Sequence, residues 1–326
     1  VGSEMCIRDR FNSFRKEFGR LRGSQAATAA DVLFLPSGHL NISDGIRRLS
    51  DGLFREEAEK ALAANGYNSG FYFTPNIQND SLYAIKDAKS PQSSSTYQGL
   101  TNAVSLFIEI RGIGLGRTSF ARRAECGFVV SRSLLETTAI HHKEVKKNIQ
   151  KAVRKTCAGK SDVYVTFQPT RTERPVSFID LSKKERFTEN LPTLDALQLK
   201  AALVRKRPKA YILPDSCPIQ AEKLRTLGIE VEKSRKPFTT TVEKYIVTEY
   251  RKSDKEWEKI YPVTVSTRVI KEKKRFAAGC FIVRLAQKNA NLAITLLEPE
   301  SVNGFVNFDV IHTGAGQELP VYREMK

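Results

Sequence analysis

The sequence predicts an α/β fold followed by a β-rich α+β half, on three observations. Residues 102–117 contain an apolar strand, a glycine-rich turn and the start of a helix, an order typical of α/β proteins. Residues 241–250 and 261–270 carry many β-branched side chains, which favour strands. The length of 326 residues is enough for two domains with sizeable cores.

The strand within residues 102–110 is apolar on both faces, which predicts a central strand of a sheet that is covered on both sides. Glu109 interrupts it. A carboxylate at the end of a buried strand is costly unless it is paired, hydrogen-bonded or used, and open α/β sheets bind ligands at the carboxyl ends of their strands. Glu109 is therefore either the partner of a nearby arginine such as Arg111, or a catalytic acid or base.

Four segments around Glu109 resemble the last catalytic strand of zinc carboxypeptidases of the carboxypeptidase A type. They are Tyr97–Leu100, Ser105–Gly112, Gly114–Arg117 and Phe120–Arg123. Three more segments, Asp31–Pro36, Leu296–Ser301 and Pro320–Arg323, resemble a bacterial branch of that family with a C-terminal accessory domain. The resemblance implies that Glu109 is the general base for a zinc-bound water. It also implies the C-terminal part of a mixed sheet with helices on both faces, followed by a β-rich α+β accessory domain.

Residues 1–10 match the in-frame translation of a sequencing adapter and are excluded from the fold. We therefore expect a fragment that lacks its amino terminus, and with it any signal peptide. The expected domains are residues 11–158, the C-terminal part of a peptidase domain, and residues 162–326, the accessory domain.

Before Glu109 the sequence predicts a strand over residues 31–35 and a helix over residues 44–65 with Ser43 as its cap. A second strand is predicted over residues 71–73, followed by a long polar loop over residues 76–96. The resemblance implies that this loop borders the substrate and carries a mobile tyrosine, for which Tyr83 and Tyr97 are both candidates.

After Glu109 a helix is predicted from residue 119 to about 156, with a break near His141 and His142. The second half should hold strands over residues 163–167, 210–214 and 229–231, and helices over residues 219–227 and 289–297. No apolar run is long enough to cross a membrane.

The net charge of +17 comes largely from basic runs at residues 143–155, 205–209 and 271–275. Such a surface attracts nucleic acid or an anionic envelope. However, no nucleic-acid motif or interleaved aromatic residue accompanies the runs, so we interpret them as solvated faces and expect no nucleic-acid partner. Cys126, Cys157, Cys217 and Cys280 are widely spaced and form no zinc motif; disulfides and free buried thiols stay open as alternatives.

The sequence does not provide the expected zinc ligands. In the resembled family these ligands are a His-x-x-Glu pair and a later histidine, all before the general base, and no such pair precedes Glu109. His141 and Glu144 have the spacing but follow Glu109 on a basic helix, and His39 lies in a Pro-Ser-Gly turn. We expect that the ligands are missing from this fragment and that the fragment itself is inactive.

The turn Gly112–Gly116 has the spacing GxGxG and not that of a dinucleotide loop, so its glycines are expected to permit a tight turn. Arg111 is expected to orient Glu109 or the substrate, if it is not simply an ion-pair partner. The resemblance implies a zinc metallocarboxypeptidase with a peptide substrate, in the periplasm or secreted. The alternatives are a non-catalytic binding protein on a peptidase scaffold and a basic nucleic-acid-binding protein.

Overall fold

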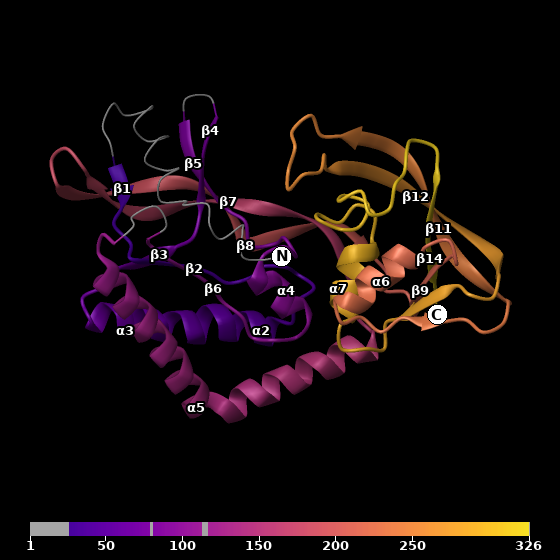
Figure 1. Cartoon of the computed structure of the whole chain (residues 1–326), viewed down its shortest axis with the longest axis horizontal. Helices are drawn as coiled ribbons and strands as arrows, with labels where there is room; N and C mark the ends of the chain where they lie inside the picture. The colour runs from indigo at the N-terminus through magenta and orange to yellow at the C-terminus, as the bar shows by residue number, and fades with distance from the viewer. Residues whose placement is uncertain (1–25, 79–80, 113–116, 326) are drawn as a thin grey trace. The chain divides into compact units, whose positions relative to one another are not determined.

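The computed structural model describes residues 26–78, 81–112 and 117–325, and its chain divides into two compact units (Figure 1). Among the described residues, the first unit contains those within 26–99, 103–149 and 168–200, and the second contains residues 100–102, 150–167 and 201–325. The chain therefore returns to the first unit after it has entered the second. The predicted domain boundary near residue 160 and the expected scar at residues 1–10 stay predictions, and the scar lies outside the described residues.

A mixed three-stranded sheet in the first unit positions Glu109. Its order is β3 (Ser69–Phe71), β2 (Val32–Leu35) and β6 (Phe107–Ile110), with β2 parallel to β3 and antiparallel to β6. All four residues of β2 are buried, as expected for four consecutive apolar residues in a central strand. On one face Val32 and Phe34 pack with residues of two helices, α3 (Arg55–Ala64) and α5 (Phe120–Ala158).

The predicted helix over residues 44–65 contains a π-helical insertion. It consists of α2 (Asp44–Arg48), the π-helix η2 (Leu49–Phe54) and α3, which run end to end in Figure 1. Within this wider turn Phe54 is buried, whereas Leu53 is only half-buried. Ser43 occupies the cap position but its side chain makes no capping hydrogen bond.

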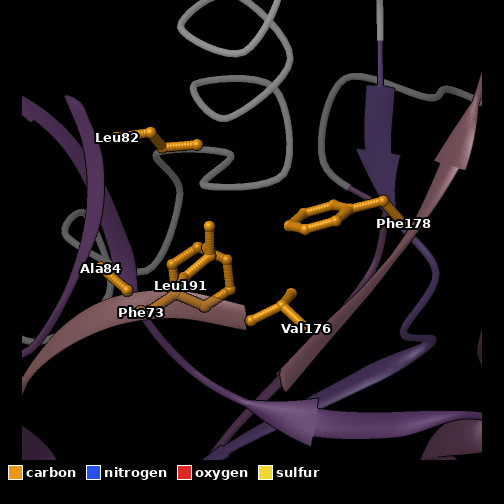
Figure 2. Close-up of a cluster of buried hydrophobic side chains, with 6 residues drawn as sticks. All are labelled: Phe73, Leu82, Ala84, Val176, Phe178 and Leu191. Atoms are coloured by element: carbon orange, nitrogen blue, oxygen red, sulfur yellow. The ribbon is translucent and has the colours of Figure 1, made fainter. Parts of the chain in front are cut away.

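A five-stranded sheet forms the rest of the first unit, in the order β1-β7-β8-β5-β4. Its strands are β1 (Ala26–Thr28), β7 (Val163–Asp180), β8 (Glu185–Arg205), β5 (Ser81–Lys86) and β4 (Thr74–Gln78). Figure 2 shows its core, in which the side chains of Phe73, Leu82, Ala84, Val176, Phe178 and Leu191 gather. The strands β7 and β8 and the helix α5 contribute residues to both units.

The predicted loop over residues 76–96 is wrong. The structure has the hairpin of β4 and β5 there, followed by helix α4 (Ser94–Leu100). Pro75 lies within β4 although proline cannot donate to a sheet ladder. It is tolerated because β4 is the last strand of its sheet among the described residues.

The second unit contains a six-stranded sheet in the order β10-β13-β9-β14-β11-β12. The strands are β9 (Ala210–Leu213), β10 (Glu232–Lys233), β11 (Phe238–Lys252), β12 (Val263–Phe276), β13 (Phe281–Arg284) and β14 (Glu318–Glu324). Helix α6 (Pro218–Thr226) ends before Gly228, whose φ of 76° suits glycine. Helix α7 (Ala290–Leu297) is buried at every residue.

Most elements predicted for the second unit are confirmed, but one of its strands begins later than predicted. The strand expected over residues 229–231 begins only at Glu232. The helix α5 is assigned without interruption through His141 and His142, where a break was expected, although Figure 1 shows that α5 bends sharply along its length. Among the described residues, no helix combines the length and the apolar character that a membrane crossing requires.

Candidate functional site at the end of strand β6

Glu109 lies at the carboxyl end of β6, paired across the sheet with Leu33 of β2. Because side chains alternate along a strand, Ile108 and Ile110 face the cluster that includes α3 and α5, while Glu109 shares the other face with Phe107. All four residues of β6 are half-buried. The side chain of Glu109 therefore lies on the sheet face opposite the helices, at a depth that combines partial burial with access to solvent.

This placement corrects two predictions about the strand. The strand covers only residues 107–110 and not residues 102–110. Asn102 lies in a turn with a φ of 64°, and residues 103–106 form no strand. Among the strands that the structure describes, β6 has β2 as its only neighbour, so it is not central. Helices were also expected on both faces, but the residues that pack with Phe107 on the face opposite α3 and α5 include Ala88 and Ala196.

An ion pair that the sequence did not suggest holds the chain beside Glu109. Arg122 of α5 donates from Nε and Nη2 to the two carboxylate oxygens of Asp31, at 2.8 and 2.7 Å. The backbone N–H of Arg111 donates to the Asp31 carbonyl at 3.0 Å, and the N–H of Asn68 donates to Asp31 Oδ2 at 2.9 Å. Burial alone would raise the pKa of Asp31, but the hydrogen bonds from Arg122 and Asn68 lower it below its ordinary value.

The next arginine of α5, Arg123, contacts the chain just after β6. Arg123 donates from Nη1 to the carbonyl of Gly112 at 2.7 Å, and a Cβ at residue 112 would lie 2.3 Å from that nitrogen. Gly112 thus permits the close approach of Arg123. Glu125 accepts a hydrogen bond from the hydroxyl of Tyr67. The remainder of the turn, residues 113–116, lies outside the described residues.

The proposed substrate residues come from different elements. Arg111 directly follows β6 and is half-buried. Tyr83 belongs to β5, where it alternates with the buried Leu82 and Ala84 and pairs with Asn76 of β4. Tyr97 is a half-buried residue of α4. Their roles, like that of Glu109, stay predictions.

His39 is buried within the loop that follows β2. Its side chain is 1% exposed, and its Nδ1 accepts the backbone N–H of Asn41 at 3.2 Å. Burial, and to a lesser extent the charge of Arg47, lowers the pKa of His39 to about 3. The imidazole is therefore neutral at physiological pH, with its proton on Nε2.

Polar contacts fix the same loop against the rest of the first unit. Ser37 Oγ donates to the carbonyl of Ala88 at 3.1 Å and lies 2.9 Å from Thr96 Oγ1. A Cβ on Gly38 would lie 1.8 Å from the carbonyl oxygen of Ala196, so only glycine fits there. Within the described residues, no group of three or more His, Cys, Asp and Glu side chains is arranged to hold a metal ion.

Sequence reasoning also missed a buried charge cluster in the five-stranded sheet. Asp195 of β8 is fully buried; Arg174 lies 2.8 Å from one of its carboxylate oxygens, and Lys86 lies 3.9 Å from the other. The ammonium of Lys86 also lies 5.3 Å from the ring centroid of Phe71. Burial lowers the pKa of Lys86 in spite of the opposing charges of Asp195 and Asp51. The signal available was a lysine at a core-facing position of β5, two residues after Ala84.

The second unit contains a buried ionic network. Glu298, which is 0% exposed, lies 2.8 Å from Arg205 and accepts a hydrogen bond from the hydroxyl of Tyr211 at 2.5 Å. Arg205 also pairs with Glu300 at 2.6 Å, and Arg323 Nε lies 3.4 Å from Glu298. The segments Leu296–Ser301 and Pro320–Arg323, which carried the resemblance far downstream, thus meet in one network.

The three basic runs differ in environment. Lys271, Lys273 and Arg275 are exposed on alternate residues of β12, the last strand of its sheet among the described residues, where charges discourage edge-to-edge pairing. The lysines of residues 143–155 are exposed on α5. The run at residues 205–209 is solvated only in part. Lys206 and Lys209 are exposed, whereas Arg207 is buried and the side chain of Arg205 is 9% exposed. Arg207 donates to Asn291 Oδ1 and to the Thr156 carbonyl.

Cys126, Cys157, Cys217 and Cys280 are free thiols, of which all but the half-buried Cys157 are buried. Of the two alternatives for these cysteines, the structure has the free thiols.

Comparisons with known proteins give relatives but no matching family model and no matching solved structure. The chain is 30% identical over 296 residues to "Carboxypeptidase 2" of Trichophyton equinum, which covers 90% of this chain and 55% of that protein. The similarity to "Carboxypeptidase 2" of Trichophyton tonsurans has the same identity and extent. "Probable carboxypeptidase 2" of Arthroderma benhamiae is 31% identical over 274 residues, 83% of this chain and 52% of that protein.

The chain spans about half the length of the curated relatives it matches. These relatives are fungal, so they support the resemblance to carboxypeptidases without supporting its bacterial branch. Over most of its own length, the chain is similar to fungal proteins named carboxypeptidase 2.

Proposed function

We propose that this chain is part of a metallocarboxypeptidase in which Glu109 is the general base. The observation that carries the proposal is the 30% identity over 296 residues to a protein named "Carboxypeptidase 2". The position of Glu109, half-buried at the carboxyl end of β6, supports its assignment as the base. Because the chain spans about half of its relatives, the activity is proposed for the longer protein.

In this proposal Glu109 takes a proton from the attacking water and later delivers it to the leaving amine. A carboxylate suits both steps, since it can accept a proton as a general base and return it as a general acid. Arg111, two residues further on, would orient Glu109 or the substrate. Its backbone is held by the Asp31 carbonyl, which restricts the path of the chain after β6. Tyr83 and Tyr97 are the proposed contacts to the peptide.

Zinc is the metal proposed for the longer protein, where it would lower the pKa of the attacking water and polarise the scissile carbonyl. The described residues of this chain do not fit that metal. They hold no suitable group of three ligands, and Nδ1 of His39 is already occupied by the N–H of Asn41. The ligands would therefore belong to a part of the longer protein outside this chain, and this chain alone should bind no stoichiometric zinc.

The test is to recover the longer reading frame from the same source DNA and to measure release of carboxyl-terminal amino acids from peptides. Glu109→Gln should lower kcat/KM about 100-fold or more, because it removes the base while keeping the shape of the side chain. Glu136→Gln, an exposed change on α5, is the matched control and should leave the rate unchanged. Equal rates for wild type and Glu109→Gln would exclude Glu109 as the base.

The second candidate is a non-catalytic binding protein on a peptidase scaffold. It is favoured by the same absence of a metal-holding group among the residues that the structure describes. A longer reading frame without a His-x-x-Glu pair and a later histidine, and without peptidase activity, would favour this candidate. The location outside the cytoplasm is proposed from the resemblance only.

A further inference from the structure

The exposed side of helix α5 has an uncharged face that is unusual for this protein. Phe120, Phe128 and Leu135 are 67%, 66% and 72% exposed. Single exposed apolar residues are ordinary, but several on one face of a helix mark a surface that another element covers. The other side of the same helix is already buried, at Cys126 and Val130 among others.

The face follows the period of a helix. At 3.6 residues per turn, nine residues from 120 to 142 fall within a stripe about 100° wide, which is the width of a core-facing stripe. They are Phe120, Ala121, Ala124, Phe128, Ser131, Leu135, Thr138, Ala139 and His142, all of them exposed. We call these nine residues the α5 outer face. None of them is an acidic or basic residue apart from the single histidine, although 27% of the whole chain is charged.

The size of the α5 outer face also indicates a partner element. Twenty-three residues of helix extend about 34 Å, the length of a full helix or of a sheet layer. Charged residues flank the face on the helix, including the exposed pair Arg132 and Glu136 at 2.8 Å. A water-facing helix normally carries such pairs all round, so their restriction to the flank indicates that the α5 outer face is not a water-facing surface.

We infer that the α5 outer face is covered by the segment of the longer protein that corresponds to the unmatched part of the relatives. The match with the Trichophyton equinum protein uses 90% of this chain but only 55% of that protein, so 45% of it has no counterpart here. Such a segment belongs to the same polypeptide as α5, so its effective concentration at the face is higher than that of a separate partner. The segment must present an apolar surface that packs against two phenylalanine rings and a leucine.

A second copy of the chain is the competing occupant, and the residues disfavour it. A self-paired coiled coil needs large apolar residues at both positions of its heptad. On the α5 outer face, one of the two heptad positions is occupied by small or polar residues, namely Ala124, Ser131 and Thr138. A symmetric pair of these faces would therefore be poorly packed.

The test uses cysteine labelling in the chain alone and in the longer protein expressed from the recovered reading frame. Leu135→Cys places a thiol on the α5 outer face, and Glu136→Cys places one on the adjacent charged flank as the matched control. Both positions are exposed, so neither change should disturb folding. The rate of reaction with N-ethylmaleimide is read for each peptide by mass spectrometry, which separates the new thiol from the native ones.

We expect both thiols to react at similar rates in the chain alone, and the thiol at position 135 to react at least about tenfold more slowly in the longer protein. The control at position 136 should be unaffected. Equal labelling of position 135 in both proteins would overturn the inference, as would a source DNA without a longer reading frame.

Protection of position 135 already in the chain alone would also overturn it. Protection that grows with protein concentration would assign the face to a second copy. Protection independent of concentration would assign it to other residues of this chain. The inference does not depend on catalysis: a longer protein that protects position 135 but releases no amino acid would retain it and refute the proposed function.

Discussion

Arg122 of α5 donates hydrogen bonds to both carboxylate oxygens of Asp31, from Nε at 2.8 Å and from Nη2 at 2.7 Å. Asp31 directly precedes β2, and its own carbonyl accepts the N–H of Arg111, two residues after Glu109. One buried carboxylate thus connects the start of β2, the end of β6 and the first turns of α5. The geometry around the proposed general base depends on this pair.

Asp31→Asn should therefore destabilise the first unit by about 1–3 kcal/mol, because it removes the charge from a bidentate pair of which one partner is buried. The lower value applies if solvent screens Arg122, whose side chain is 46% exposed. The measurement is the free energy of unfolding in urea. Glu136→Gln, which breaks the exposed pair with Arg132, is the control and should cost about 0.5 kcal/mol or less. A cost no larger than this control would show that the pair is not a structural tie.

Gly38→Ala should destabilise the first unit far more than the addition of one methyl group normally does. The new Cβ would lie 1.8 Å from the carbonyl oxygen of Ala196 and 2.7 Å from the Cα of Leu197, and both are backbone atoms. We expect a loss of about 3 kcal/mol or more, since the loop and β8 must separate. Gly52→Ala is the matched control: no atom lies within 4 Å of the new Cβ, and helical alanine is favoured over glycine by about 0.5–1 kcal/mol. Thermal unfolding of the two variants compares them directly; similar midpoints would mean that residue 38 has more room than the structure shows.

The sequence could predict elements wherever local pattern and packing agree. The 39-residue helix α5, the buried β2 and the apolar α7 have strong periodicity or continuous apolar character, and each lies close to its predicted range. The hairpin of β4 and β5 was missed because its polar residues and Pro75 satisfy the criteria for a loop. Its strand character comes from pairing with the distant β8, which no local pattern records.

The residues of the candidate site were also predictable only where a local pattern marks them. Glu109 was found because a carboxylate in an apolar strand is conspicuous, and its position at the end of a strand followed from the sequence. Its neighbour Asp31 was not found, because the partner Arg122 lies 91 residues away. Likewise, Arg205 was assigned to a solvated basic run, whereas Glu298 and Glu300 enclose it from 93 and 95 residues away. Ion pairs between distant segments are fixed by tertiary structure, and composition alone assigns such residues to the surface.

Glu298→Gln should destabilise the second unit by about 1–3 kcal/mol. The change keeps the volume but removes one buried carboxylate from Arg205 and Arg323, while Glu300 and Glu243 still pair with these arginines. Glu222→Gln is the control, because Glu222 is 72% exposed and pairs with Arg225 at 3.6 Å. It should cost about 0.5 kcal/mol or less. If calorimetry gives both variants the same unfolding temperature, the network contributes little.

Acid should destabilise the first unit through His39. The pKa of His39 is about 3 in the folded protein, where burial excludes the charged form, and about 6.5 in an unfolded chain. Between these values the unfolded state binds more protons, so stability rises with pH. The contribution of His39 is thus complete above pH 6.5 and is lost as the pH falls toward 3, by about 1 kcal/mol per pH unit.

His39→Asn tests this pH dependence, because the asparagine oxygen can accept the same N–H of Asn41 but does not titrate. The variant should be less stable than wild type at pH 7, owing to the smaller side chain, yet its stability should fall less steeply between pH 6 and pH 4. His142→Gln, an exposed change on α5, should leave the wild-type slope intact. Urea unfolding at a series of pH values gives the slopes. Parallel curves for wild type and His39→Asn would mean that His39 is protonated in the folded state, and that its loop is open to water.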